Sequence, residues 1–133
     1  MKAVFLSLAL LAAIALADPV VKEESFDLSA SGDEVDIRSV DYPEDAPALL
    51  RQTWKINAPE GYNVRIECYD IRLFEDKPCG DWALTFTAGD LKEEMCTTSF
   101  DYKKTFEGNK LEMALRIGDH ARGFVGCKAK AVK

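Results

Sequence analysis

The sequence predicts an all-β fold, an antiparallel β-sandwich held by two disulfides. Short segments in which apolar and polar residues alternate recur along the chain, and turn-forming residues separate them. Helical periodicity is nearly absent, and only residues 91–95 are expected to form a brief helical turn. Four cysteines, an even number, follow an apolar leader, and paired cysteines in exported chains usually form disulfides.

Residues 1–17 have the three parts of a secretory signal peptide. Lys2 supplies a positive charge, an apolar run follows, and Ala15-Leu16-Ala17 is a small-x-small cleavage signal. The apolar run is too short to cross a bilayer comfortably, and a buried N-terminal helix is the alternative. No later stretch is long and apolar enough to anchor the chain. We therefore expect a secreted, extracellular protein without membrane insertion.

The mature chain that this cleavage would leave is acidic. Without Lys2 it has 16 basic and 23 acidic residues, a net charge of −7. Nucleic acids and anionic membranes bind positive surfaces, so neither is an expected partner. Residues 18–31 have few large apolar side chains and are expected to form a loose N-terminal arm. Residues 32–133 are long enough for one folded domain.

The first strands are expected where apolar and polar side chains alternate, and a proline-glycine turn follows the second of them. Residues 33–38 alternate, and residues 52–57 alternate around an inward-facing Trp54. Ala58-Pro59-Glu60-Gly61 suits a type I turn, with proline at the second position and glycine at the fourth. Val64, Ile66 and Cys68 then share one face. Residues 51–68 are therefore interpreted as a β-hairpin that serves as scaffold.

Three further strands complete the prediction. Residues 82–87 precede the turn signal Ala88-Gly89-Asp90. Residues 110–117 alternate large apolar side chains with mostly charged neighbours, and residues 123–132 place Cys127 on the apolar face. Short strands at this spacing, without intervening helices, favour a β-sandwich over an α/β fold.

Motifs along the chain resemble those of CUB domains, a family of extracellular β-sandwiches. Residues 38–43 resemble the family's S-P-N-Y-P element, and residues 54–66 resemble W-x-I-x-A-P-x-G-Y-x-V-x-L. Cys79-Gly80-Asp81-Trp82, Gly108-Asn109-x-Leu111 and Gly118-Asp119…Gly123-Phe124 follow in the family's order. The resemblance covers residues 32–131 and implies a CUB-like jelly roll.

The cysteines depart from the usual CUB pattern. The family's N-terminal cysteine pair is absent, and Gln52 stands where its second member would be. The pattern is similar to CUB modules of insect secreted trypsin-like proteases, and this resemblance implies the pairs Cys68–Cys127 and Cys79–Cys96. The faces of the predicted strands agree, because Cys68 and Cys127 both lie on apolar faces. From the residues alone, the other two pairings stay open.

The chemistry of the loops favours binding over catalysis. His120 is the only histidine, and it could act as a base for Ser99 or Thr105. The sequence contains no Gly-x-Ser-x-Gly motif and no serine-protease signature, however, so a catalytic role is not expected. No enzyme activity and no cofactor are expected. Many CUB domains bind Ca²⁺, and Asp81 and Asp119 approximately match two ligand positions.

The third calcium position counts against a complete site. Arg72 falls where the family has a glutamate, and its positive charge would repel the ion. Glu75 or Asp76 could substitute, but acidic residues in solvated loops are the simpler interpretation.

The resemblance implies a stand-alone secreted module that recognises an extracellular protein, or a glycan, as a component of a secreted fluid or venom. The candidate binding loops contain Arg72, Glu75, Asp76, Asp119, His120 and Arg122. The alternatives are a regulatory module derived from a secreted serine protease and a small secreted inhibitor or ligand carrier.

One charge asymmetry is left to explain. Residues 99–133 carry eight basic and four acidic side chains. Pairing of opposite charges across strands is the favoured interpretation, and docking of an acidic glycan or protein is the alternative.

Overall fold

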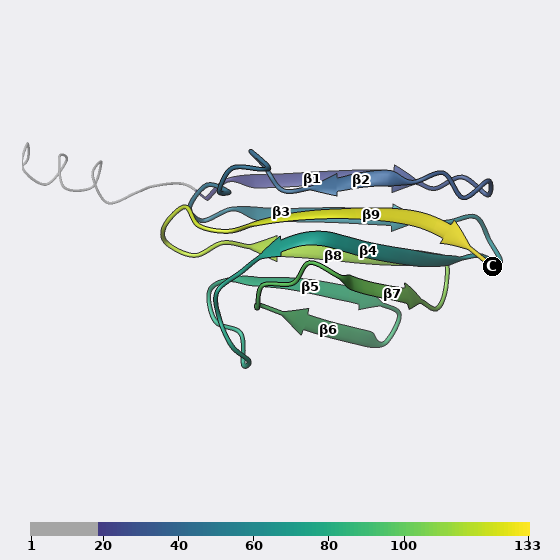
Figure 1. The fold of residues 1–133 in the computed structure, drawn as a ribbon. Helices are drawn as coiled ribbons and strands as arrows, with labels where there is room; N and C mark the ends of the chain where they lie inside the picture. The colour runs from purple at the N-terminus through teal and green to yellow at the C-terminus, as the bar shows by residue number, and fades with distance from the viewer. Residues whose placement is uncertain (1–18) are drawn as a thin grey trace, which may run out of the picture.

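The computed structural model describes residues 19–133, so the expected signal peptide lies outside the described residues. Nine strands in this part of the chain form two sheets that face each other (Figure 1). The five-stranded sheet has the order β1-β3-β8-β5-β6, and the four-stranded sheet has the order β2-β9-β4-β7. Every pairing is antiparallel except that of β1 with β3. The predicted all-β sandwich is confirmed.

The strand bounds follow the alternation in the sequence closely. The five-stranded sheet contains β1 (Val21–Asp27), β3 (Arg51–Asn57), β8 (Lys110–Arg116), β5 (Ala83–Ala88) and β6 (Leu91–Met95). The four-stranded sheet contains β2 (Val35–Arg38), β9 (Phe124–Val132), β4 (Asn63–Arg72) and β7 (Tyr102–Phe106). Within residues 19–133 there is no helix that could span a membrane.

The core fills the space between the sheets. Trp54, Phe86 and Met113 from the five-stranded sheet are at most 1% exposed, as are Ile66 and Phe106 from the four-stranded sheet. These residues occupy alternate positions of their strands, so each strand gives one face to the core and one to solvent. Trp54 is an inward-facing core residue, as predicted.

The predicted hairpin over residues 51–68 is wrong. β3 and β4 belong to different sheets and pair with β8 and β9 respectively. The turn between them spans residues 59–62, one residue later than expected, and the Tyr62 N–H donates to the Pro59 carbonyl at 3.0 Å. Gly61 occupies its third position with φ +85°, which favours glycine. Alternation shows which side chains face the core, but it does not identify a strand's partner.

The predicted loose arm and the predicted helical turn are also strands. Residues 18–31 include β1, which pairs with β3 over its whole length. Phe26 packs on the core and Leu28 is 5% exposed, so two apolar side chains and a row of backbone bonds hold this edge. Residues 91–95 form β6, an edge strand that pairs with β5 after a turn at Gly89. Edge strands need little apolar surface, which is why composition misidentified both.

Gln52 is a buried polar residue, 1% exposed, that links both sheets. Its Oε1 accepts the Val40 N–H at 3.0 Å. Its Nε2 donates at 3.2 Å to the Arg38 carbonyl at the end of β2 and at 3.2 Å to the Glu24 carboxylate on β1. In the family, this position holds a cysteine of the N-terminal pair that is missing here. In this chain the Gln52 amide links the two sheets with hydrogen bonds instead.

The structure joins Cys68 to Cys127 and Cys79 to Cys96, the pairing that the resemblance implies. Cys68 and Cys127 are direct neighbours on β4 and β9, with Cα atoms 3.9 Å apart, and both are buried. A β-bulge follows between Cys68 and Asp70. Cys79 and Cys96 join two loops at one end of the sandwich.

Candidate binding surface at the loop end

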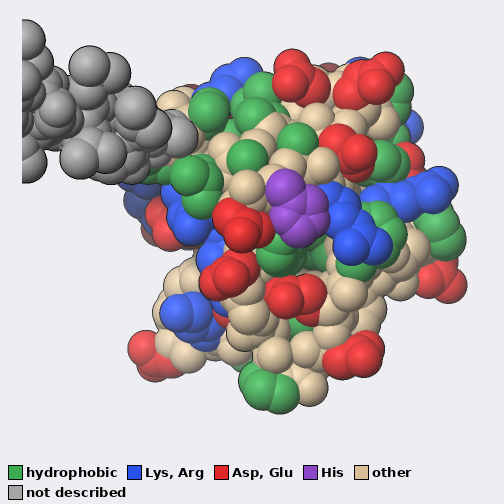
Figure 2. All heavy atoms as spheres, turned by 90° about the vertical axis from the view of Figure 1, so that its left-hand side faces the viewer, with side chains coloured by type: hydrophobic (Ala, Val, Ile, Leu, Met, Phe, Trp, Pro, Cys, Tyr) green, Lys and Arg blue, Asp and Glu red, His purple; other side chains and the backbone are tan. Residues whose placement is uncertain are grey.

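Four connections gather at one end of the sandwich, at left in Figure 1. They are residues 39–50, 73–82, 96–101 and 117–123, and we call this region the loop end. Its eight acidic side chains outnumber two basic ones, Lys77 and Arg122. The acidic residues are Asp41, Glu44, Asp45, Glu75, Asp76, Asp81, Asp101 and Asp119. Figure 2 shows this end, with red carboxylates around the single histidine.

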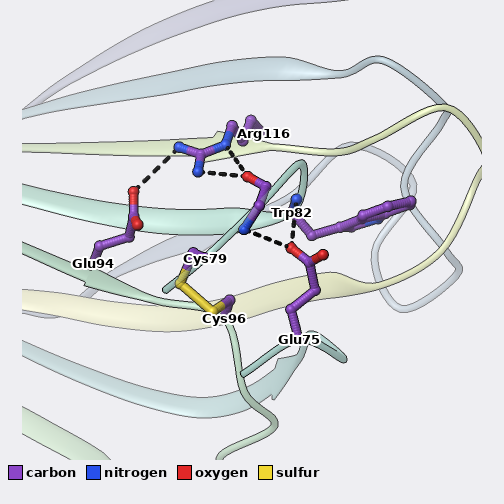
Figure 3. Close-up of a disulfide and its surroundings, with 7 residues drawn as sticks. Glu75, Cys79, Trp82, Glu94, Cys96 and Arg116 are labelled. Carbon is purple, nitrogen blue, oxygen red and sulfur yellow. Dashed lines mark hydrogen bonds and ion pairs between the residues drawn. A yellow bond between two sulfur atoms is a disulfide. The ribbon is translucent and has the colours of Figure 1, made fainter. Parts of the chain in front are cut away.

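Glu75 organises the loop of residues 73–82 from within. Its Oε1 accepts the backbone N–H groups of Gly80 and Trp82, both at 3.0 Å (Figure 3). Its own N–H donates to the Cys96 carbonyl at 2.9 Å, beside the Cys79–Cys96 disulfide. A carboxylate that accepts two backbone N–H groups fixes the loop much as a bound anion would. The loop is therefore held by its own side chains.

Arg116, at the end of β8, supports the same loop from below. Its Nε and Nη2 donate to the Gly80 carbonyl at 2.9 and 2.6 Å, and its Nη1 donates to Glu94 on β6 at 3.2 Å (Figure 3). Gly80 is thus bound through its N–H by Glu75 and through its carbonyl by Arg116. This double contact fixes the backbone just before Trp82.

Trp82 connects this loop to residues 117–123. Its ring lies directly over Gly118, where an added Cβ would approach the ring to 2.5 Å, so the contact requires glycine. Its indole N–H donates to the Arg122 carbonyl at 3.0 Å, and the His120 ring lies edge-on at 4.8 Å.

Arg122 in turn covers the ring of Phe74, with 3.9 Å between its guanidinium carbon and the ring centroid. Phe74 is 49% exposed. We call Phe74 and Arg122, with Trp82 and His120 beside them, the Phe74–Arg122 cluster. Together with Glu75 these residues line a shallow hollow of about 150 Å³. Aromatic residues, phenylalanine included, and arginine are enriched at protein interfaces, and arginine is among the residues that most often dominate the binding energy.

The candidate calcium residues do not converge. Asp81 is exposed, and the Asp119 side chain is 86% exposed and bonds only to His120, at 3.0 Å. Arg72 pairs with Asp70 at 3.3 Å and lies between the rings of Phe100 and Phe124. Among residues 19–133 no three acidic, histidine or cysteine side chains come together as a metal site would require. The donor set therefore does not fit a calcium ion.

Ser99 and Thr105, the two nucleophiles considered for His120, have other partners in the structure. Thr105 accepts a hydrogen bond from Arg65 at 3.2 Å, and Ser99 pairs through its backbone with Ile71. The histidine instead contacts Asp119 and Trp82. It is therefore part of the Phe74–Arg122 cluster at the loop end.

The structure brings together three of the predicted loop residues, Glu75, His120 and Arg122, and leaves Asp76 exposed. Arg72 points instead toward Phe100 and Phe124. Sequence reasoning missed Phe74, Trp82 and Arg116. Phe74 could have been found as a large apolar residue in a loop rich in charge. Arg116 gave no such signal, because it has the appearance of an ordinary outward residue of an alternating strand.

Three solved structures resemble this fold and define its class. The CUB1-EGF-CUB2 region of rat MASP-1 superposes with a TM-score of 0.72 at 17% identity, over 83% of this chain and 42% of that one. The extracellular region of zebrafish Gpr126/Adgrg6 gives 0.68 at 22% identity, over 88% and 15%. The MASP-1 CUB2 domain bound to Ca²⁺ gives 0.65 at 20% identity, over 78% and 96%. The first two proteins are much longer than this chain, and all three show the fold alone. That fold is a CUB domain.

Sequence similarity establishes the family. No family model matches the chain. It is 56% identical over 133 residues to "Venom CUB domain-containing protein 2" of Platymeris rhadamanthus, covering 100% of this chain and 99% of that protein. The chain belongs to the CUB domain family.

Proposed function

We propose that this protein is a secreted, non-catalytic binding module that recognises an extracellular protein through its loop end. The observation that carries the proposal is the exposed Phe74–Arg122 cluster, mounted on loops that a disulfide, Glu75 and Arg116 fix in place. A rigid scaffold that presents an aromatic residue and an arginine lowers the entropic cost of binding. The venom relative supports release into a secreted fluid, venom included.

The charge of the loop end indicates the kind of protein partner. The loop end carries eight carboxylates against two basic side chains, one of which is Arg122 of the cluster itself. A basic protein surface complements this distribution, and opposite charges raise the rate of encounter. Binding should therefore weaken as salt is added, because exposed charges are screened beyond about 8–10 Å near physiological ionic strength.

The test uses the oxidised protein to capture partners from two sources. One is the fluid that the producing tissue secretes, and the other is the fluid of the organism or tissue that receives the secretion. The double variant Phe74→Ala/Arg122→Ala removes the cluster. The double variant Leu91→Ala/Lys92→Ala is the control, because it also removes an exposed apolar and a basic side chain, at the opposite end of the sandwich. A partner retained by the control and lost by the cluster variant is expected. Equal capture by both variants would refute the proposed surface.

A further inference from the structure

The outer face of the four-stranded sheet is basic, although the whole chain carries a net charge of −6. Six cationic side chains lie on outward positions of its strands, with three carboxylates among them. The cations are Arg38, Arg65, Arg72, Lys103, Lys128 and Lys130, and the carboxylates are Asp36, Glu67 and Asp70. This face therefore has the opposite charge to the loop end.

Internal pairing, the interpretation favoured from the sequence, accounts for four of these six cations. Each carboxylate pairs with an arginine two residues away on its own strand, at 3.2 to 3.6 Å. Of the three lysines, only Lys128 has a carboxylate partner within residues 19–133, Glu34 at 3.9 Å, so Lys103 and Lys130 are in surplus. All these pairs are at the surface, where they hold their side chains weakly.

A hollow of about 480 Å³ lies on this face, lined by Arg38, Tyr42, Glu67, Tyr69 and Lys128. The bulge after Cys68 creates one wall. Cys68 and Ile71 are both buried although they are three residues apart, so Tyr69 and Asp70 are both placed toward the outer face.

Tyr42 forms the opposite wall by folding back from the loop after β2. Its ring crosses Gly126, where an added Cβ would approach it to 2.8 Å, and its hydroxyl donates to Asp70 at 2.9 Å. The rings of Tyr42 and Tyr69 stand at 77° to each other with centroids 6.4 Å apart. The hollow thus has two fixed aromatic walls.

Apart from the Glu67 carboxylate, which pairs with Arg65 at 3.2 Å, the polar groups that line the hollow carry donors. Arg38 donates to the Tyr69 hydroxyl oxygen at 3.4 Å, which leaves that hydroxyl free to donate its own proton to a ligand. The Lys128 ammonium lies 6.0 Å from the Tyr69 ring centroid, and the Arg38 guanidinium 5.6 Å from that of Tyr42. Aromatic walls with donors and positive charge fit a ring that carries an anionic group.

We propose that this hollow and the basic face around it bind an acidic glycan, a polysaccharide whose sugar rings carry sulfate or carboxylate groups. A sugar ring would lie against Tyr69, with its anionic group between Arg38 and Lys128. The next cations, Lys130 and its cross-strand neighbour Arg65, lie two residues farther along β9, about 7 Å away. A chain of repeating anionic rings can contact both pairs of cations, whereas a single small anion cannot. This hollow shares no lining residue with the hollow of the Phe74–Arg122 cluster and does not depend on that cluster's function.

The probe is a heparin hexasaccharide, titrated calorimetrically into the oxidised protein at low salt. Arg38→Gln/Lys128→Gln should weaken binding at least about tenfold, since each lost charged hydrogen bond is worth about 1.5 kcal/mol or more. The control Lys92→Gln/Lys110→Gln makes the same charge change on the other sheet and should change affinity less than about twofold. Tyr69→Ala should weaken binding, while Tyr69→Phe, which keeps the ring, should bind nearly as wild type.

Several outcomes would overturn the proposal. One is no binding of the hexasaccharide at low salt, and another is equal loss in the two charge variants, which would indicate unspecific attraction. Equal binding of poly-glutamate would assign the face to acidic proteins, and equal binding of a desulfated, carboxyl-reduced hexasaccharide would show that the anionic groups of the glycan do not contribute. Phe74→Ala/Arg122→Ala should bind the hexasaccharide like wild type, so failure here is distinguishable from failure at the loop end.

Discussion

Replacing Gln52 by leucine should destabilise the domain by about 2–4 kcal/mol, a large part of the roughly 5–15 kcal/mol expected for a domain of this size. Leucine preserves most of the volume but removes all three hydrogen bonds of the amide. The Val40 N–H and the Arg38 carbonyl would lose their buried partner, at about 1–3 kcal/mol each. The Glu24 carboxylate is about a third exposed and can be solvated, so it adds little.

Urea unfolding followed by tryptophan fluorescence measures this effect. With a slope of about 1.5 kcal/mol/M, the midpoint should fall by about 1.5–2.5 M. Thr53→Val is a suitable control, because it changes the neighbouring outward residue of β3 and should alter stability by less than about 0.5 kcal/mol. A loss below about 1 kcal/mol for Gln52→Leu would refute the view that this amide links the two sheets.

Four further predictions follow from the same structure. Removing the Cys68–Cys127 disulfide by a double alanine substitution should lower the free energy of unfolding by about 4 kcal/mol, given its sequence separation of 59. Urea unfolding measures this loss, and a clearly smaller value would contradict the prediction. Glu75→Gln should loosen residues 73–82 and speed their cleavage by a protease at least severalfold without unfolding the sandwich; unchanged cleavage would show that the carboxylate does not hold the loop. Millimolar Ca²⁺ should shift the melting temperature by less than about 1 °C, whereas a site of ordinary extracellular affinity would raise it by several degrees. Burial, and then the hydrogen bond to Asp70, raises the pKa of Tyr42 to about 12, so the folded state holds a proton that the unfolded state releases near pH 10. The stability from this group is complete below pH 10 and falls as the pH rises from 10 to 12, so Tyr42→Phe should lessen the loss of stability over that range; an identical pH dependence in both proteins would contradict the assignment.

The sequence predicted the core well because burial leaves a local signature. The alternation over residues 110–117 corresponds to β8, and Trp54 and Cys127 lie inward as their neighbours indicated. Which strands pair with each other in a sheet leaves no such local signature in the sequence. β3 and β4 are joined by a four-residue turn and still enter different sheets, because the turn can connect either a hairpin or two facing layers.

The candidate binding surface was only partly predictable, for a related reason. Glu75, His120 and Arg122 were singled out as charged or polar loop residues, and they do lie together. The aromatic residue beneath Arg122 and the arginine beneath Gly80 depend on contacts across 40 or so residues of chain, which no local pattern records. The outer-face hollow depends on a bulge and on a loop that folds back, and neither can be read from alternation.

The two disulfides differ in their exposure to solvent, and this difference determines which of them is reduced first. Cys68 and Cys127 are at most 1% exposed, whereas Cys79 is partly exposed at the loop end. A mild reductant should reach the outer bridge first, because thiol exchange requires access to a sulfur atom. In a reducing environment the loop end would therefore loosen while the sandwich stayed folded, and the proposed recognition would end before the domain unfolded.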